Sequence, residues 1–317
     1  MVNTPSQLSR VGHEIQVRGL SKRYGRTIAV DNLTFTVRSG IVTGFVGPNG
    51  AGKTTTMRLI LGLDSPTAGA VTVGGRRYRD FGAPLREVGA IIDAQGVHPR
   101  RSAFHHLLAA AQSNGIPKRR VDEVLGQVGL AGAAARRVGD FSLGMKQRLA
   151  IAGALLGDPP VLMFDEPING LDPEGIIWVR GLMRELAAQG RTVFVSSHLM
   201  SEMSQTADHL IVIGKGRLLR DESVTEFLDE GAQQRTLVRA HPQQKLIHEL
   251  EAVGAVIEAG PDSSIHVSGI ACAAIGELAA TTGVTLHELT PLRVSLEDAF
   301  VEATHGSLEY QTPKDAA

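Results

Sequence analysis

The sequence predicts an α/β protein built on a mainly parallel sheet, followed by a small α+β domain. Short apolar segments alternate with helical segments between residues 161 and 213, which is typical of a parallel sheet covered by helices on both faces. A glycine-rich turn joins an apolar strand at 41–46 to a helix at about 53–61. Beyond Gly231 the composition changes, and the elements expected there follow the order of a split βαβ unit.

The region before about residue 80 is expected to be antiparallel, apart from that strand–turn–helix unit. Residues 15–20 and 33–37 have the apolar character of strands. Residues 70–73 and Tyr78 flank Gly74-Gly75, a dipeptide suited to the tight turn of a β-hairpin. We therefore expect an antiparallel β subdomain beside the parallel sheet.

A helical subdomain is expected over residues 102–157. Apolar residues recur there at steps of three and four, as at Val121, Val124 and Val128. The parallel sheet then resumes. Its expected elements are a strand at 161–164, a helix at 175–189 ended by Gly190, and strands at 192–196 and 210–213.

The C-terminal part is expected to be a separate accessory domain that serves regulation or dimer support. Its expected elements are strands at 236–240, 255–258, 264–267 and 285–289 and helices at 243–253 and 272–282. A last helix is expected at 295–304, with its apolar residues on one face. The expected division is a nucleotide-binding domain at 13–230, the accessory domain at 231–304 and a disordered tail at 305–317.

Composition argues against several classes of protein. The formal net charge is −1, so no overall positive field favours a nucleic-acid partner, and none is expected. The short basic clusters Arg76-Arg77 and 118–120 are interpreted as solvated turns. The polar segment 1–12 does not resemble a signal peptide, no run approaches a membrane span, and Cys272 is the single cysteine. We therefore expect a cytoplasmic protein.

A phosphate-binding loop is the most specific motif in the sequence. It fits G-x-x-x-x-G-K-[ST] and lies between a strand and a helix, as that motif requires. Glycines let successive N–H groups converge on phosphate oxygens at a helix N-terminus. Lys53 would reach the β- and γ-phosphates, and the Thr54 hydroxyl would bind Mg²⁺. The residues predicted to hold ATP here are Gly47, Pro48, Asn49, Gly50, Ala51, Gly52, Lys53, Thr54 and Thr55.

Two carboxylates end the apolar segment 161–164. Because α/β proteins bind ligands at the carboxyl ends of parallel strands, Asp165 and Glu166 are candidates for the same site. Asp165 would orient Mg²⁺, and Glu166 would orient or deprotonate the attacking water. Together with the phosphate loop, these residues predict a P-loop NTPase that hydrolyses ATP.

The remaining motifs resemble those of the ABC (ATP-binding cassette) ATPases. Residues 141–148, Phe-Ser-Leu-Gly-Met-Lys-Gln-Arg, resemble the family's signature, whose usual core is Leu-Ser-Gly-Gly-Gln. Residues 169–172, Asn-Gly-Leu-Asp, look like the D-loop, and residues 196–198, Ser-Ser-His, look like the switch histidine. Tyr24 stands where the family carries an aromatic residue that stacks on adenine. The resemblance covers about residues 15–229.

The resemblance implies a dimeric mechanism. Two cassettes would meet head to tail, each ATP lying between the phosphate loop of one chain and the signature of the other. Ser142 and the backbone at Gly144 would contact the γ-phosphate of the partner's ATP, at a helix N-terminus that suits an anion. Asp172 of the D-loop would also belong to the nucleotide site. His198 would contact the γ-phosphate and respond to its loss.

Two departures from the family pattern are visible. The signature has Leu143 and Met145 where the family has glycine and glutamine, while Ser142 and Gly144 are kept. The family's Q-loop glutamine, a Mg²⁺ ligand, aligns with Asp93. Gln95, two residues later, is the alternative ligand.

The resemblance points to a transporter rather than to other ABC proteins. A single phosphate loop argues against translation-type members, which usually carry two cassettes, and no long coiled coil separates Lys53 from Asp165 as in DNA-repair members. A soluble protein acting on ribosomes or DNA, and a cassette that binds ATP without turnover, remain as alternatives. Residues 91–94, 169–175 and 296–300 are similar to ATPases of the daunorubicin and bacitracin resistance exporters. This similarity implies a separate membrane permease as partner and a peripheral position on the membrane's inner face.

Overall fold

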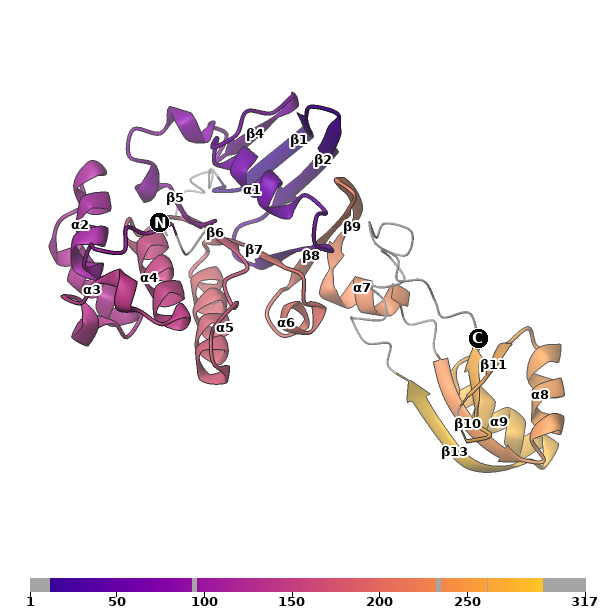
Figure 1. The fold of residues 1–317 in the computed structure, drawn as a ribbon. Helices are drawn as coiled ribbons and strands as arrows, with labels where there is room; N and C mark the ends of the chain where they lie inside the picture. Colours follow the sequence, from indigo (N-terminus) through magenta and orange to yellow (C-terminus); the bar gives the residue numbers. More distant parts are fainter. Residues whose placement is uncertain (1–11, 93–95, 232–234, 261, 293–317) are drawn as a thin grey trace, which may run out of the picture. The chain divides into compact units, whose positions relative to one another are not determined.

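The structure, a computed structural model, describes residues 12–92, 96–231, 235–260 and 262–292. These residues form two compact units, which divide between Ser223 and Val224 (Figure 1). The division falls somewhat before the boundary that composition suggested at residues 230 and 231. The expected C-terminal helix at 295–304 and the tail lie outside the described residues.

A six-stranded sheet forms the centre of the first unit. Five of its strands are parallel, and β9 pairs antiparallel with β8. Four of the parallel strands are almost completely buried, as expected for a sheet that is covered on both faces. The strand order is β5 (Val88–Ile91), β6 (Val161–Asp165), β7 (Thr192–Ser197), β3 (Val42–Val46), β8 (His209–Gly214) and β9 (Arg217–Ser223).

One face of this sheet is covered by helix α1 (Lys53–Ile60) and by the predicted antiparallel β subdomain. That second sheet has the order β2 (Thr27–Val37), β1 (Ile15–Tyr24) and β4 (Ala68–Val73). The aromatic rings of Phe35 and Phe45 lie 5.6 Å apart between the two sheets. Helices α5 (Pro173–Ala188) and α6 (Met200–Ser204) cover the other face, so the predicted layers are confirmed (Figure 1).

The predicted helical subdomain is also confirmed. It contains α2 (Ala103–Ser113), α3 (Arg119–Gln127) and α4 (Leu143–Leu155), which contact one another.

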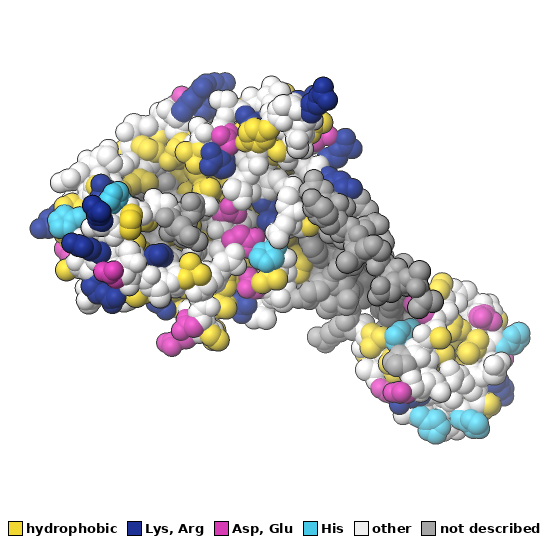
Figure 2. Space-filling view, viewed as in Figure 1, with side chains coloured by type: hydrophobic (Ala, Val, Ile, Leu, Met, Phe, Trp, Pro, Cys, Tyr) yellow, Lys and Arg dark blue, Asp and Glu magenta, His cyan; other side chains and the backbone are white. Residues whose placement is uncertain are grey.

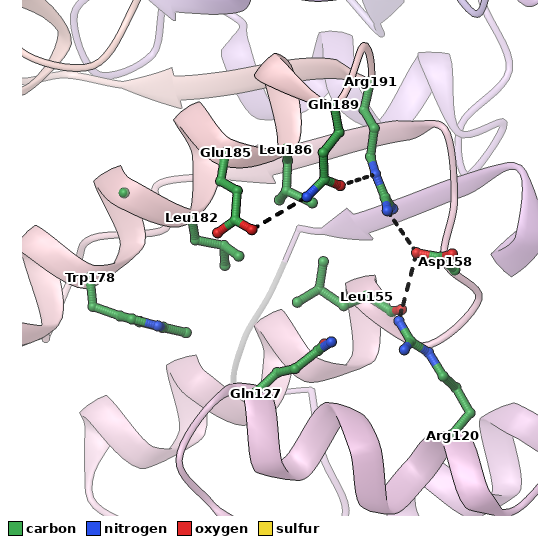
Figure 3. A pocket seen from close by; sticks show the side chains of 11 residues that line it. Arg120, Gln127, Leu155, Asp158, Trp178, Leu182, Glu185, Leu186, Gln189 and Arg191 are labelled. Atoms are coloured by element: carbon green, nitrogen blue, oxygen red, sulfur yellow. Dashed lines mark hydrogen bonds and ion pairs between the residues drawn. The ribbon is translucent and has the colours of Figure 1, made fainter.

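Asp158 joins this subdomain to the sheet. Its Oδ1 atom lies 2.8 Å from Arg191 Nη2, just before β7, and 3.7 Å from Arg120 Nη2 in α3 (Figure 3). Arg120 also donates a hydrogen bond of 3.0 Å to the carbonyl oxygen of Leu155. The charged contacts of Asp158 therefore link α3 to the segment that leads into β7.

Three local predictions need correction. Gly74 and Gly75 do make a tight turn with positive φ values of 55° and 77°, but only a single bridge, Val73 to Arg76, follows it. Tyr78 begins a 3₁₀ turn rather than a returning strand. Strands β5 and β9 were not predicted. β5 is only four residues long and contains Gly89, so it lacks the sustained apolar run that marks the other parallel strands.

The second unit confirms the predicted order of strands and helices. After α7 (Val224–Gly231) come β10 (Arg235–His241), α8 (Gln243–Ala252), β11 (Val256–Ala259), β12 (Ile265–Ser268), α9 (Cys272–Thr282) and β13 (Thr285–Leu292). The strand order β11-β12-β10-β13 is antiparallel throughout, as a split βαβ arrangement requires. The second unit has an apolar core of its own, to which α8 contributes Leu246 and α9 contributes Ile275. Within the described ranges, no helix of either unit has the length and apolar character that crossing a bilayer requires.

Two glycine substitutions should change the stability of the first unit in opposite directions. In Gly89→Ala, the new Cβ would overlap the backbone carbonyl of Ala154 in α4, so we expect a loss of about 2–3 kcal/mol. In Gly126→Ala, the Cβ would meet open space in a helix, so we expect a gain of about 0.5–1 kcal/mol. Denaturant unfolding followed by Trp178 fluorescence measures both, because Trp178 is the single tryptophan and lies in α5. Equal effects of the two changes would contradict this packing of α4 on β5.

Candidate functional site

The phosphate loop connects β3 to α1 and is held closely by two neighbouring strands. Gly52, just before α1, has φ 103°, a conformation that side chains rarely adopt. A Cβ on Gly52 would lie 2.5 Å from the carbonyl oxygen of Ala29 in β2, and one on Gly47 would lie 2.5 Å from that of Ile213 in β8. The loop therefore needs glycine for both conformation and space. Its predicted nucleotide-binding residues lie on one continuous turn that ends at a helix N-terminus.

Lys53 is directed back over this loop. Its side chain is buried, with the residue 7% exposed, and Nζ donates hydrogen bonds to the carbonyl oxygens of Gly47 at 2.6 Å and Pro48 at 3.3 Å. Burial lowers the pKa of Lys53, while the charges of Glu166 and Asp165 oppose that shift. The ammonium group is therefore short of negative charge, and an anion in the loop would supply it.

Asp165 connects three segments of the chain at the carboxyl ends of the strands. Its Oδ2 accepts a hydrogen bond of 2.6 Å from the Thr54 hydroxyl, and its Oδ1 accepts one from the Ser196 hydroxyl. The Ser196 oxygen in turn accepts a hydrogen bond of 3.0 Å from the backbone N–H of Glu166. The Thr54 hydroxyl, the Asp165 carboxylate, the Ser196 hydroxyl and the backbone N–H of Glu166 therefore form one hydrogen-bonded group. Ser196 was not assigned a role from the sequence, although its place at the end of β7 was the signal available.

Glu166 and His198 form the next pair. The Nδ1 atom of His198 lies 2.9 Å from Oε2 of Glu166. The donor in this bond depends on the tautomer of the ring, and Nε2 is left for a further partner. Glu166 has a positive φ of 50°, which is uncommon for a residue with a side chain.

The signature and D-loop residues begin two other helices. Ser142 caps α4, where its Oγ accepts a hydrogen bond of 3.2 Å from the N–H of Met145. Asp172 caps α5, where its Oδ1 accepts one of 3.0 Å from the N–H of Gly175. Both caps are exposed. Within the described part of the chain, no hydrogen bond or ion pair joins either residue to the phosphate loop.

The signature and the D-loop contact each other. A Cβ on Gly170, which has φ 79°, would overlap the side chain of Leu143, and one on Gly144 would lie 3.4 Å from the Gly170 carbonyl oxygen. The buried Gln147 side chain donates a hydrogen bond of 2.8 Å to the carbonyl oxygen of Pro167. The N-terminal turn of α4 is thus seated on the loop that follows Glu166. Sequence reasoning missed this role of Gln147 and Leu143 because the contact joins residues that are distant in the chain.

Tyr24 lies at the end of β1 and is 47% exposed. Its hydroxyl donates a hydrogen bond of 2.9 Å to Asp64, and the Lys22 ammonium lies 4.8 Å from its ring centre. Its assignment to adenine rests on the family resemblance. Asp93 and Gln95, the two alternatives for the Q-loop ligand, lie outside the described residues.

Comparison with known proteins agrees with this geometry. The ABC transporter family model matches residues 30–169, and a domain of unknown function (DUF8746) matches residues 234–297. A solved structure of the ATP-binding subunit of an ABC transporter has a TM-score of 0.62 and 29% identity, covering 68% of this chain and 92% of that chain.

Two curated relatives extend the agreement. The bacitracin transport ATP-binding protein BcrA of Bacillus licheniformis is 37% identical over 303 residues, covering 92% of this chain and 97% of BcrA. The lantibiotic transport ATP-binding protein SrtF of Streptococcus pyogenes is 36% identical over 220 residues, covering 68% of this chain and 94% of SrtF. The chain therefore belongs to the ABC transporter family, as one of its ATP-binding subunits.

Proposed function

We propose that two copies of this chain bind and hydrolyse ATP head to tail and so drive a membrane exporter. The observation that carries the proposal is the separation of two sets of residues within one chain. Lys53, Asp165 and Glu166 gather around the phosphate loop, whereas Ser142 is exposed at the start of another helix and makes no hydrogen bond with them in the described chain. A second copy supplies the signature that each phosphate loop lacks.

The residues at the loop fit a Mg²⁺ ion. The Thr54 hydroxyl and the Asp165 carboxylate already lie 2.6 Å apart, and both offer the oxygen ligands that this hard cation prefers. With ATP present, the ion would neutralise charge on the phosphates. Thr54 and Asp165 would then hold it, and Ser196 would keep the Asp165 carboxylate oriented.

The pair of Glu166 and His198 is proposed to carry the hydrolytic step. Water attacks the γ-phosphate, the bond to the β-phosphate oxygen breaks, and ADP and phosphate leave. Glu166 orients the water and accepts its proton, and His198, held in place by its contact with Glu166, faces the γ-phosphate. Tyr24 is proposed to stack on adenine and Asp172 to face the partner's nucleotide. Loss of the γ-phosphate contacts then reopens the dimer.

The cargo is proposed to be an antibiotic or drug-like molecule. BcrA and SrtF are named for bacitracin and lantibiotic transport, and BcrA matches almost the whole length of this chain. A separate permease would recognise the cargo, with this chain docked on its inner face. Isolation of the chain from native membranes, followed by identification of a co-purifying protein with several spans, tests the partnership. Co-purification with ribosomes or DNA instead would contradict it.

Glu166→Gln should slow hydrolysis by a factor of about 10² to 10⁴, the usual contribution of a general base. The amide keeps the shape of the side chain but cannot accept a proton, so ATP should persist in a stable dimer. Single-turnover assays measure the step directly. Glu202→Gln is the matched control, because Glu202 lies near the site and burial raises its pKa, yet it is not assigned to the chemistry. Similar rates for Glu166→Gln and the native chain would refute the assignment.

Ser142→Asp should abolish hydrolysis and leave ATP binding to the monomer intact. Aspartate caps a helix as well as serine does, so α4 should persist, but its charge would repel the partner's triphosphate. Ser102→Asp makes the same change at the cap of α2 and should have little effect. The measurements are ATPase rate per chain against protein concentration and nucleotide binding at low concentration. A native rate per chain that stays constant into the monomeric range would rule out the composite site.

Asp93→Asn should weaken the dependence of ATP binding on Mg²⁺ and impair hydrolysis. A carboxylate near the triphosphate repels it unless a cation lies between them, so removing the charge should reduce the ratio of affinities with and without Mg²⁺. We expect this ratio of affinities to fall roughly tenfold, the lower end of the effect of losing a group that supports a metal site. Gln95→Ala should do less. A larger effect from Gln95→Ala would assign the Q-loop role to Gln95.

A further inference from the structure

Positive charge is concentrated in one part of this nearly neutral chain. Residues 96–157 contain nine lysines and arginines but only three acidic residues, a formal net charge of +6. The chain as a whole carries −1, so the remainder carries −7. This stretch includes the helical subdomain, and Figure 2 shows dark blue and cyan side chains gathered over α2 and α3.

The fold brings much of this charge together. The segment before α2 runs beside the segment 134–139, joined by backbone hydrogen bonds from Phe104 N to Ala134 O at 2.9 Å and from Val138 N to Arg101 O at 3.0 Å. This pairing places two Arg-Arg dipeptides from distant parts of the sequence next to each other. Lys118 joins them, because its ammonium lies 5.4 Å from the ring centre of Phe104. We call Arg100, Arg101, Lys118, Arg136 and Arg137 the basic surface.

The charges of the basic surface are largely uncompensated. All five residues are exposed, and none of them makes an ion pair with another described residue. Arg136 donates only to the backbone oxygen of Asp140, at 3.2 Å. Burial lowers the pKa of His106, and the charge of Arg101 lowers it further. The fold therefore keeps like charges close together, an arrangement that costs free energy without an anionic partner.

A hollow of about 430 Å³ opens among these residues. Arg100 and Arg137 line it together with apolar atoms of Phe104, Ala134 and Ala135. Charged side chains around an apolar floor suit a molecule that has both an anionic group and a hydrocarbon part.

We propose that the basic surface binds the anionic headgroups of a lipid bilayer. Its cations lie on flexible, exposed side chains, and no hydrogen bonds hold Arg100, Arg101 or Arg137 in one recognition geometry within the described structure. Such side chains suit a field of many similar anions better than one specific acidic segment, whose pairing favours preorganised, bidentate arginines. The inference rests on the proposed function in one respect, since it is as part of an exporter that the chain would work at a membrane.

The position of the basic surface would link membrane contact to the ATP site. Residues 136 and 137 lead through a 3₁₀ turn, Val138–Asp140, directly to Ser142 at the start of α4. Arg136 also lies 5.8 Å from the ring centre of Phe141. Headgroups that held this surface would therefore orient the signature end of the helical subdomain at the bilayer, independently of contacts with a permease.

Vesicle binding by the full chain tests the proposal. We expect co-sedimentation with vesicles of phosphatidylglycerol and phosphatidylcholine but not with phosphatidylcholine alone, and weaker binding as salt is added. The triple change Arg100→Gln, Arg101→Gln and Arg137→Gln should weaken binding roughly 100-fold, since each cation near an anionic surface contributes about fivefold. The control triple, Arg38→Gln, Arg77→Gln and Arg79→Gln, removes equal charge from exposed positions of the β subdomain and should change binding little.

Several results would overturn the proposal. These are no binding to the anionic vesicles, equal binding to both kinds of vesicle, equal loss in the two triple variants, or binding of a poly-glutamate peptide in place of vesicles. ATPase activity measured on the same preparations separates this inference from the proposed function. Absent vesicle binding with normal hydrolysis would reject the basic surface alone, whereas absent hydrolysis in the native chain would reject the proposed function.

Discussion

The carboxylate of Asp165 is the contact on which the rest of the site depends. It accepts hydrogen bonds from Thr54 at the start of α1 and from Ser196 at the end of β7. Asp165 itself ends β6, so its side chain joins two strands of the parallel sheet to the first helix. Ser196 then fixes the backbone of Glu166, whose side chain contacts His198. One buried, shared acid therefore links the positions of Thr54, Ser196, Glu166 and His198.

A second constraint on the site is the balance of charge around the phosphate loop. Lys53 is buried against backbone carbonyls, and burial lowers its pKa despite the two nearby carboxylates. The carboxylates would also repel a triphosphate. Both imbalances are relieved together when an anion and a divalent cation enter the loop, because the anion compensates Lys53 and the cation compensates Asp165 and Glu166.

The signature end of the molecule is built from different interactions. Leu143 packs against Gly170, and Gln147 holds the carbonyl of Pro167, so the N-terminal turn of α4 is attached to the loop that follows Glu166. A change at Glu166 can therefore reach the signature through direct contacts within the same chain. One departure from the usual signature sequence, Leu143, lies in this packing, while the exposed cap, Ser142, is kept.

The sequence alone determined the layered α/β fold and the second α+β unit, and it predicted the residues of a nucleotide site. It could do so because a phosphate loop needs glycine, lysine and threonine at fixed spacing, and because the buried strands are continuous apolar runs. Tertiary structure decided what depends on segments that are distant in the chain. Examples are the role of Ser196, the contact of Leu143 with Gly170, and the short edge strand β5. The arginine pairs at 100–101 and 136–137 are distant in the sequence, and only backbone pairing between their segments makes them one surface.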